Sequence, residues 1–165
     1  MVNKEEIPVL KALDELEIPY TRVTHPPIYT VSEAKAYGNF EADGCKNLFF
    51  YDKHNERYYL VVMLEDKKAH SNTIRKQVKA RQLVFGCEED LMRLLGVIPG
   101  SVSPFGIVND VKKEVTVLID EDLPKSEKVC FHPNINTATL VLKYSDFEKF
   151  LEWSGNEHRF ICVTN

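Results

Sequence analysis

A loop rich in glycine and proline is the stretch of this sequence best suited to chemistry. Residues 96–109 contain three glycines and two prolines, which are Gly96, Gly100, Gly106, Pro99 and Pro104. Proline fixes φ and lacks an N–H group, while glycine leaves the backbone uncovered by a side chain. Such a loop can aim free N–H groups, and the hydroxyls of Ser101 and Ser103, at an anion or a carbonyl oxygen. An ordinary connection from a helix to a strand explains the same composition.

Lys46 and Asn47 form a second candidate site. They are followed at once by the apolar residues 48–50, and a lysine that opens such a run is poorly explained by solubility. At the edge of a pocket its ammonium group can bind a phosphate or polarise a carbonyl, and burial would lower its pKa toward that of a base. The alternative is a lysine at a strand end whose charged group extends into solvent.

His132 is the third candidate. It stands between an apolar run and Pro133, so its ring is expected to project from the end of a strand. A neutral imidazole there can hold a water molecule or the ester and hydroxyl groups of a substrate. Asn136 and Thr137 follow and can orient the ring. A structural histidine beside ordinary turn residues explains the same pattern.

A rigid wall is predicted around His25, which is followed by Pro26 and preceded by Tyr20. Proline and tyrosine rings provide stiff apolar surface with a single polar tip. A loop held by a structural histidine is an equally good interpretation. Cys45, beside Lys46, has no recognisable histidine partner, so a thiolate nucleophile is not expected.

Composition predicts a soluble cytoplasmic protein without a metal or nucleotide cofactor. The 165 residues are 44% hydrophobic and 28% charged, which is enough for one core. The cysteines are widely spaced, and no Cys-x-x-Cys, Gly-x-Gly-x-x-Gly or His-Glu-x-x-His pattern occurs. No apolar run is long enough to cross a membrane, and the N-terminus lacks a signal-peptide core, so we expect no membrane partner.

The charge is unevenly distributed along the chain. A net charge of -4 argues against a protein that holds nucleic acid by general electrostatics. The segment 67–81 differs, because it carries basic residues and no acid; these are Lys67, Lys68, Arg75, Lys76, Lys79 and Arg81. This segment is expected to form either a basic face that contacts phosphates or a solvated helix face.

Hydrophobic periodicity and capping residues predict the secondary structure. Helices are expected at residues 4–17, 32–37, 72–78, 88–95 and 145–153, with caps at Asn3 and Glu6, Ser71, Ser145, Gly96 and Gly155. Strands are expected at 20–24, 47–51, 58–64, 82–85, 105–109, 114–120, 128–131, 137–143 and 159–163. Hairpins should join 47–51 to 58–64 and 105–109 to 114–120. The order predicts a single α+β domain over residues 1–165, with a mixed, mostly antiparallel central sheet surrounded by helices.

Four stretches together resemble the YbaK/ProX family of aminoacyl-tRNA deacylases, the free-standing relatives of the editing domain in bacterial prolyl-tRNA synthetase. They are residues 24–27, 44–49, 99–106 and 132–139. In that family the lysine matched by Lys46 contacts the aminoacyl-adenosine end of the substrate, and no cysteine nucleophile is used. The stretch 99–106 is more similar to the ProX branch, which removes alanine, than to the YbaK branch, which removes cysteine.

The resemblance implies a trans-editing hydrolase that deacylates Ala-tRNA(Pro). Its expected partners are the acceptor end of mischarged tRNA(Pro) and, as a further candidate, prolyl-tRNA synthetase. Lys46, Asn47 and His132 are the predicted catalytic residues. The predicted substrate-binding residues are Tyr20, His25, Pro26, Gly100, Ser101, Ser103, Gly106, Asn136 and Thr137. Two alternatives stay open: release of cysteine, and a non-catalytic module that binds tRNA ends or a synthetase.

The resemblance also implies a mechanism without a side-chain nucleophile. Backbone N–H groups between Gly100 and Gly106 are expected to stabilise the carbonyl oxygen as it gains charge. Lys46 and Asn47 would fix the terminal adenosine and the ester, and the terminal ribose hydroxyl would help to place the attacking water.

Overall fold

The centre of the protein is a mixed sheet with helices on both faces. The computed structural model describes residues 1–28 and 41–164. Within them eight strands form the order β1-β7-β6-β2-β3-β5-β8, with β4 paired to β2 beside this path. The strands are β1 (Thr21–Thr24), β2 (Asp43–Asp52), β3 (Arg57–Leu64), β4 (Val84–Phe85), β5 (Val115–Asp120), β6 (Lys128–Phe131), β7 (Ala138–Lys143) and β8 (His158–Ile161). The predicted α+β class with a mixed sheet is confirmed.

The first predicted hairpin is confirmed and the second is wrong. β2 and β3 pair antiparallel from Cys45 opposite Leu64 to Asp52 opposite Arg57. Residues 105–109, however, belong to the 3-10 helix η2 (Pro104–Asn109), and β5 pairs in parallel with both β3 and β8. Ser103 explains the difference, because its hydroxyl accepts a hydrogen bond from the N–H of Phe105 and so caps a helical turn.

The four α-helices within the described residues lie close to their predicted positions. They are α1 (Ile7–Glu15), α3 (Ser71–Gln77), α4 (Glu88–Leu95) and α5 (Tyr144–Ser154), and a further 3-10 turn, η3, covers Leu123–Lys125. Gly96 and Gly155 end α4 and α5 in the left-handed conformation, with φ of 66° and 76°, as predicted. The helix expected at 32–37 lies outside the described residues.

The predicted N-terminal caps are only partly right. At α1 the Glu6 carboxylate accepts from the N–H of Asn3 at 2.9 Å, which is half of the expected capping box, and the helix itself begins at Ile7. At α3 the cap is the His70 side chain, which accepts from the N–H of Thr73, and not Ser71. At α5 the helix begins one residue before Ser145, and its cap makes no side-chain hydrogen bond.

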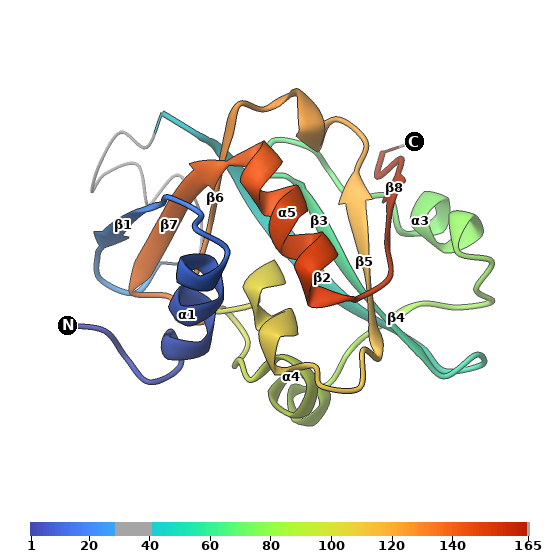
Figure 1. Ribbon diagram of the computed structural model, residues 1–165. Helices are drawn as coiled ribbons and strands as arrows, with labels where there is room; N and C mark the ends of the chain where they lie inside the picture. The colour runs from blue at the N-terminus through green and yellow to red at the C-terminus, as the bar shows by residue number, and fades with distance from the viewer. Residues whose placement is uncertain (29–40, 165) are drawn as a thin grey trace.

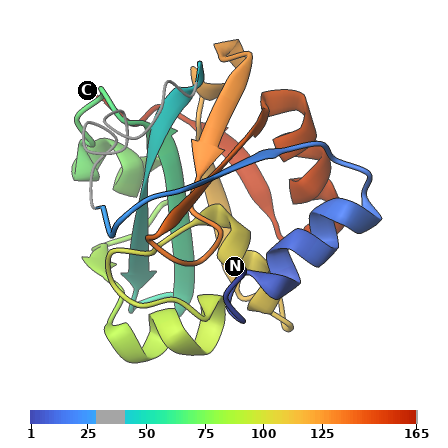
Figure 2. The same cartoon turned by 90° about the vertical axis from the view of Figure 1, so that its left-hand side faces the viewer.

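Two hydrophobic clusters lie on opposite faces of the sheet. One packs the sheet against α1, α4, η2 and α5, and the other packs it against α3. Figure 2 shows α1 and α5 on one side of the strands and α3 on the other. Side chains alternate between these faces along β2, so that Phe49 joins the first cluster and Phe50 the second. Among the described residues, no helix has the length and apolar character needed to cross a bilayer.

Candidate active site

The strands β2 and β6 part immediately after they meet, and the candidate residues lie at this divergence. The two strands run parallel but pair only at Asp43 with Val129 and Gly44 with Cys130. Beyond these pairs the two strands separate within the sheet, β6 toward β7 and β1, and β2 toward β3 and β5 (Figure 1). Lys46 lies two residues past the last pair on β2, and His132, the first residue after β6, lies two residues past the same pair. Residues 86 positions apart in the sequence are therefore brought to the same level of the sheet.

Asn47 connects β2 to the loop rich in glycine and proline. Its Nδ2 donates to the carbonyl oxygen of Val102 at 3.3 Å. Its Oδ1 is buried and has no partner among the described residues. An amide with one satisfied and one open end can hold the loop while accepting a hydrogen bond from a ligand. Two of the stretches singled out in the sequence thus meet in the structure.

Lys46 lies on the other face of β2. It pairs with Met63, which belongs to the cluster beneath α3, while Asn47 pairs with Val62 of the opposite cluster. The side chain of Lys46 is half-buried and has no hydrogen bond or ion pair with any other described residue. The structure thus places an uncompensated ammonium group beside the divergence, which suits it to an electron-rich ligand.

One ring nitrogen of His132 is hydrogen-bonded, and the other has no partner among the described residues. Its Nδ1 lies 2.9 Å from the carbonyl oxygen of Ala138, and because a carbonyl only accepts, Nδ1 carries the proton. Burial lowers the pKa of His132 below its ordinary 6.5; the bond to Ala138 raises it, and the nearby His25 ring lowers it. The ring is therefore neutral at neutral pH, and its Nε2, which has no partner among the described residues, can accept a hydrogen bond.

His25 supports His132 from β1 and β7. The two ring centroids lie 6.1 Å apart in an edge-to-face arrangement. The Nδ1 of His25 donates to the carbonyl of Pro26 at 2.9 Å, and its Nε2 accepts from the Thr139 hydroxyl at 2.8 Å. His25 is buried, whereas the Pro26 side chain is exposed. Of the predicted wall, the structure brings His25 to His132, while Tyr20 packs against the first core cluster instead.

The loop between α4 and η2 uses several of its polar groups internally. The N–H groups of Ser101 and Gly106 donate to the carbonyls of Ile98 and Ser103. Ser103 is fully buried, and its hydroxyl caps η2. Gly106 lies against α4, where a Cβ would come within 2.8 Å of the Leu95 Cβ. Among the described residues, the loop N–H groups left without a partner are those of Val97, Ile98, Gly100, Val102 and Ser103.

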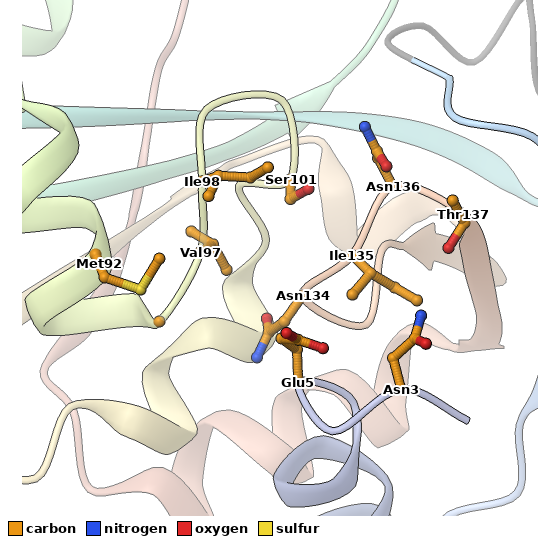
Figure 3. A pocket seen from close by; sticks show the side chains of 11 residues that line it. Asn3, Glu5, Met92, Val97, Ile98, Ser101, Asn134, Ile135, Asn136 and Thr137 are labelled. Carbon is orange, nitrogen blue, oxygen red and sulfur yellow. The ribbon is translucent and has the colours of Figure 1, made fainter.

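A pocket of about 400 Å³ opens where this loop faces the loop after β6 (Figure 3). It contains three predicted substrate-binding residues, which are Ser101, Asn136 and Thr137. Its other lining residues are Asn3, Glu5, Met92, Gly96, Val97, Ile98, Asn134 and Ile135. Lys46, Asn47 and His132 do not line this pocket, although His132 is only two residues from Asn134.

Sequence reasoning missed Asn134 and the contribution of the segment before α1 to the pocket. Asn134 is 3% exposed, and neither its Nδ2 nor its Oδ1 has a partner among the described residues. Its φ of 67° is one that asparagine tolerates, so the residue looks like an ordinary turn residue in the sequence. The position of Asn3 and Glu5 depends on a long-range ion pair between Glu6 and Arg22 at 2.8 Å, which no local pattern reveals.

Other candidate chemistry is not supported by the structure. Burial raises the pKa of the Cys45 thiol well above its usual range, which disfavours a thiolate nucleophile. No group of three or more histidine, cysteine, aspartate or glutamate side chains suited to a metal occurs in the part of the chain that is described. In the basic segment Lys67 is paired with Asp120 and Asp122 at 2.7 and 2.6 Å, so it adds little to a free basic face.

Comparison with known proteins identifies the family of this chain. Residues 25–150 match the aminoacyl-tRNA editing domain family. The chain belongs to this family. The prolyl-tRNA editing protein ProX of Acetoanaerobium sticklandii is 39% identical over 154 residues, covering 93% of this chain and 94% of that protein. The prolyl-tRNA synthetase associated domain-containing protein 1 of Bos taurus is 32% identical over 140 residues, covering 82% of this chain and 81% of that protein.

A solved structure confirms the editing-domain fold independently. A crystal structure provisionally described as a trans-editing enzyme for prolyl-tRNA synthetase superposes with a TM-score of 0.72 at 15% identity, over 98% of this chain and 99% of that one. The resemblance predicted from the sequence is confirmed, and with it the enzyme class, an aminoacyl-tRNA deacylase. The matched region of the editing domain contains every predicted site residue except Tyr20.

Proposed function

We propose that this protein is a trans-editing hydrolase that releases alanine from Ala-tRNA(Pro), with residues 1–165 acting as one editing domain in the cytoplasm. The observation that carries the proposal is the hydrogen bond from Asn47 to the Val102 carbonyl at 3.3 Å. It joins the strand of Lys46 to the loop of unpaired N–H groups, beside the divergence that also exposes the open Nε2 of His132.

The choice of alanine follows from the loop at residues 99–106 and from the relative named ProX. A pocket built for proline cannot strongly reject a smaller apolar side chain, because a missing methylene is worth only about 1–3 kcal/mol. A second pocket too small for proline supplies the discrimination that the first one lacks. The same reasoning fits cysteine, so the amino acid is tested directly below.

In the proposed mechanism three groups act on the ester without forming a covalent intermediate. Lys46 reaches the ester and the terminal adenosine from the other face of β2, past the point where β2 and β6 separate. The N–H groups of Gly100, Val102 and Ser103 stabilise the carbonyl oxygen as it becomes negative. Water is the nucleophile, and it donates a hydrogen bond to the neutral Nε2 of His132, which fixes its position together with the terminal ribose hydroxyl.

Prolyl-tRNA synthetase is a further proposed partner, because a synthetase must charge tRNA(Pro) with the wrong amino acid before this enzyme can act. The acceptor end of that tRNA is the proposed ligand of the site. A protein that acts after the synthetase gains by capturing the product before it reaches the ribosome.

The first experiment compares hydrolysis of Ala-tRNA(Pro), Cys-tRNA(Pro) and Pro-tRNA(Pro) by the wild-type protein and by Lys46→Ala. We expect the wild type to prefer the alanyl ester, and Lys46→Ala to reduce kcat/KM about 100- to 1000-fold, as expected for the loss of one group that stabilises developing charge. Lys53→Ala, an exposed lysine at the far end of the same strand hairpin, is the matched control and should retain activity.

Each alternative has its own outcome in this assay. Preference for the cysteinyl ester would assign the protein to cysteine release. Protection of every ester from spontaneous hydrolysis would identify a binding module in place of an enzyme. Near-wild-type turnover by a folded Lys46→Ala variant would remove the ammonium group from the mechanism.

A further inference from the structure

Asn134 presents an unpaired amide inside a pocket to which no ligand group has yet been assigned. Asn134 is only 3% exposed, and both of its side-chain amide atoms lack partners among the described residues. Leaving a buried donor and acceptor unsatisfied costs about 1–3 kcal/mol each. A glycine would satisfy the left-handed turn at this position without that penalty. The amide is therefore explained best by a ligand that pairs with it.

The walls of the pocket fit a flat ring. Val97, Ile98, Met92 and Ile135 supply its apolar surface (Figure 3). Met92 and Ile98 are 52% and 57% exposed, so large apolar side chains stand open to solvent at the pocket. Nucleobases stack on apolar and sulfur-containing side chains without regard to sequence, which suits such walls.

The charge of the pocket excludes a phosphate. Glu5 is the only charged residue among those that line it, and no lysine, arginine or histidine does so. A phosphate would therefore meet a carboxylate with no cation to offset it. A neutral ring that offers both a donor and an acceptor is compatible with this environment.

We propose that this pocket binds the adenine base of the 3′-terminal nucleotide of the tRNA, with Asn134 as the residue that reads it. The inference rests on the proposed function. An asparagine amide pairs in bidentate fashion with adenine, its Oδ1 accepting from the N6 amino group and its Nδ2 donating to a ring nitrogen. Guanine presents two acceptors on the corresponding edge and does not match this pattern.

Asn134 is close enough to His132 for a single nucleotide to reach both residues. The two residues are separated only by Pro133, so their Cα atoms lie at most about 7 Å apart. The base and the ester oxygen of one nucleoside are separated by a similar distance. A nucleotide whose ester lies at the Nε2 of His132 thus reaches Asn134 with its base, while Ser101 and Thr137 line the space between the two loops.

The direct test measures binding without hydrolysis. Adenosine, purine riboside, which lacks the N6 amino group, and inorganic phosphate are titrated into the wild-type protein, and the side-chain amide signals of Asn134 are followed by NMR. We expect adenosine to shift these signals, purine riboside to bind about tenfold more weakly, and phosphate to leave them unchanged. Equal binding of the two nucleosides, or displacement of adenosine by phosphate, would overturn the proposal.

Asn134→Gly separates reading of the base from a structural role. Glycine accepts the backbone conformation, so the variant should fold, and its preference for adenosine over purine riboside should fall to about onefold, since the groups that discriminate are gone. Glu56→Gly, at another left-handed residue in the turn between β2 and β3, should keep the tenfold preference. A retained preference in Asn134→Gly would also overturn the assignment.

Hydrolysis of charged tRNA whose terminal adenine is replaced by purine distinguishes this proposal from the proposed function. If the wild type hydrolyses both tRNAs equally, the base site is wrong and the deacylase function stands. If it hydrolyses neither, yet binds adenosine in an Asn134-dependent manner, the deacylase function is wrong and the base site stands.

Discussion

The two loops that meet at the strand divergence treat their polar groups in opposite ways. In the segment 96–109 the Ser103 hydroxyl caps η2, and the Nδ2 of Asn109 donates to the carbonyl of Leu95 at 2.9 Å. In the segment 132–137 the amide of Asn134 is buried without a partner, and the Nε2 of His132 is open among the described residues. In the first segment the Ser103 and Asn109 side chains are paired and the open groups are backbone N–H groups, whereas the second segment leaves side-chain atoms open.

This difference divides the site into two parts. We call the segment 96–109 the support and the segment 132–137 the reader. Buried polar groups that are fully paired rigidify a structure, whereas an unpaired buried group costs free energy that a bound water, ion or ligand can recover. We therefore expect changes in the support to reduce stability and changes in the reader to reduce activity.

His132→Gln should have the largest effect of the changes discussed here, and it should act on activity. Glutamine keeps a polar side chain but not the neutral Nε2 acceptor at its position, so kcat/KM should fall about 100-fold. The unfolding midpoint should stay near that of the wild type. Deacylation kinetics and thermal denaturation measure the two quantities, and His54→Gln, in the exposed turn after β2, is the control.

The pH dependence of the wild type sharpens the same prediction. Because burial lowers the pKa of His132 below 6.5, the ring stays neutral until the pH falls below that value. The rate constant kcat/KM should then fall on the acidic side, and the free energy of unfolding should fall with it, since the unfolded chain binds the proton more readily. An acidic limb that persists unchanged in His132→Gln would assign it to another group.

Gly106→Ala should have the next largest effect, and it should act on stability. The added Cβ would lie 2.8 Å from the Leu95 Cβ and 3.1 Å from the Leu95 carbonyl oxygen. Overpacking of this kind costs about 1–3 kcal/mol, which lowers Tm by roughly 2–4 °C for each kcal/mol in a chain of this size. Chemical denaturation measures the loss.

Gly106→Ala and His132→Gln together test the division of the site into a support and a reader. Gly106→Ala that remains folded should keep most of its kcat/KM, whereas His132→Gln should lose activity without losing stability. If Gly106→Ala instead abolished hydrolysis at full stability, the packing of Gly106 on Leu95 would position the N–H groups of Gly100, Val102 and Ser103 for catalysis, and the division between the two loops would be wrong.

The sequence predicted the fold correctly where the signals are local. Gly96 and Gly155 end helices because they accept a left-handed conformation, and the hairpin of β2 and β3 follows from two apolar runs on either side of a polar turn. Residues 105–109 were misread as a strand because a short apolar run does not distinguish a strand from a helical turn. Here Ser103 and Pro104 carried the overlooked helix-start signal.

What could not be predicted depends on long-range pairing. The parallel contact of β2 with β6, and its end after Gly44, leave no trace in either segment alone, so the sequence could not place Lys46 and His132 at the same level of the sheet. The opposite orientations of the Lys46 and Asn47 side chains follow from strand alternation and could have been predicted from the sequence. The role of Asn134 could not be predicted, because only its burial without a partner distinguishes it from an ordinary turn residue.

The smallest predicted effect lies outside both loops, on the basic segment that includes the end of α3. Lys76 and Lys79 are exposed, and their side chains have no partner among the described residues, unlike Lys67. If this face contacts the acceptor stem, replacing both by alanine should raise KM roughly threefold to tenfold at low salt, with kcat unchanged, and the difference should shrink as salt screens the phosphates.

Replacing Lys11 and Lys112, which are also exposed, changes net charge equally and is the matched control. An equal rise in both double variants would indicate attraction by overall charge, whereas no change in either would assign the face to solubility and leave recognition to the loop of Asn134 and His132.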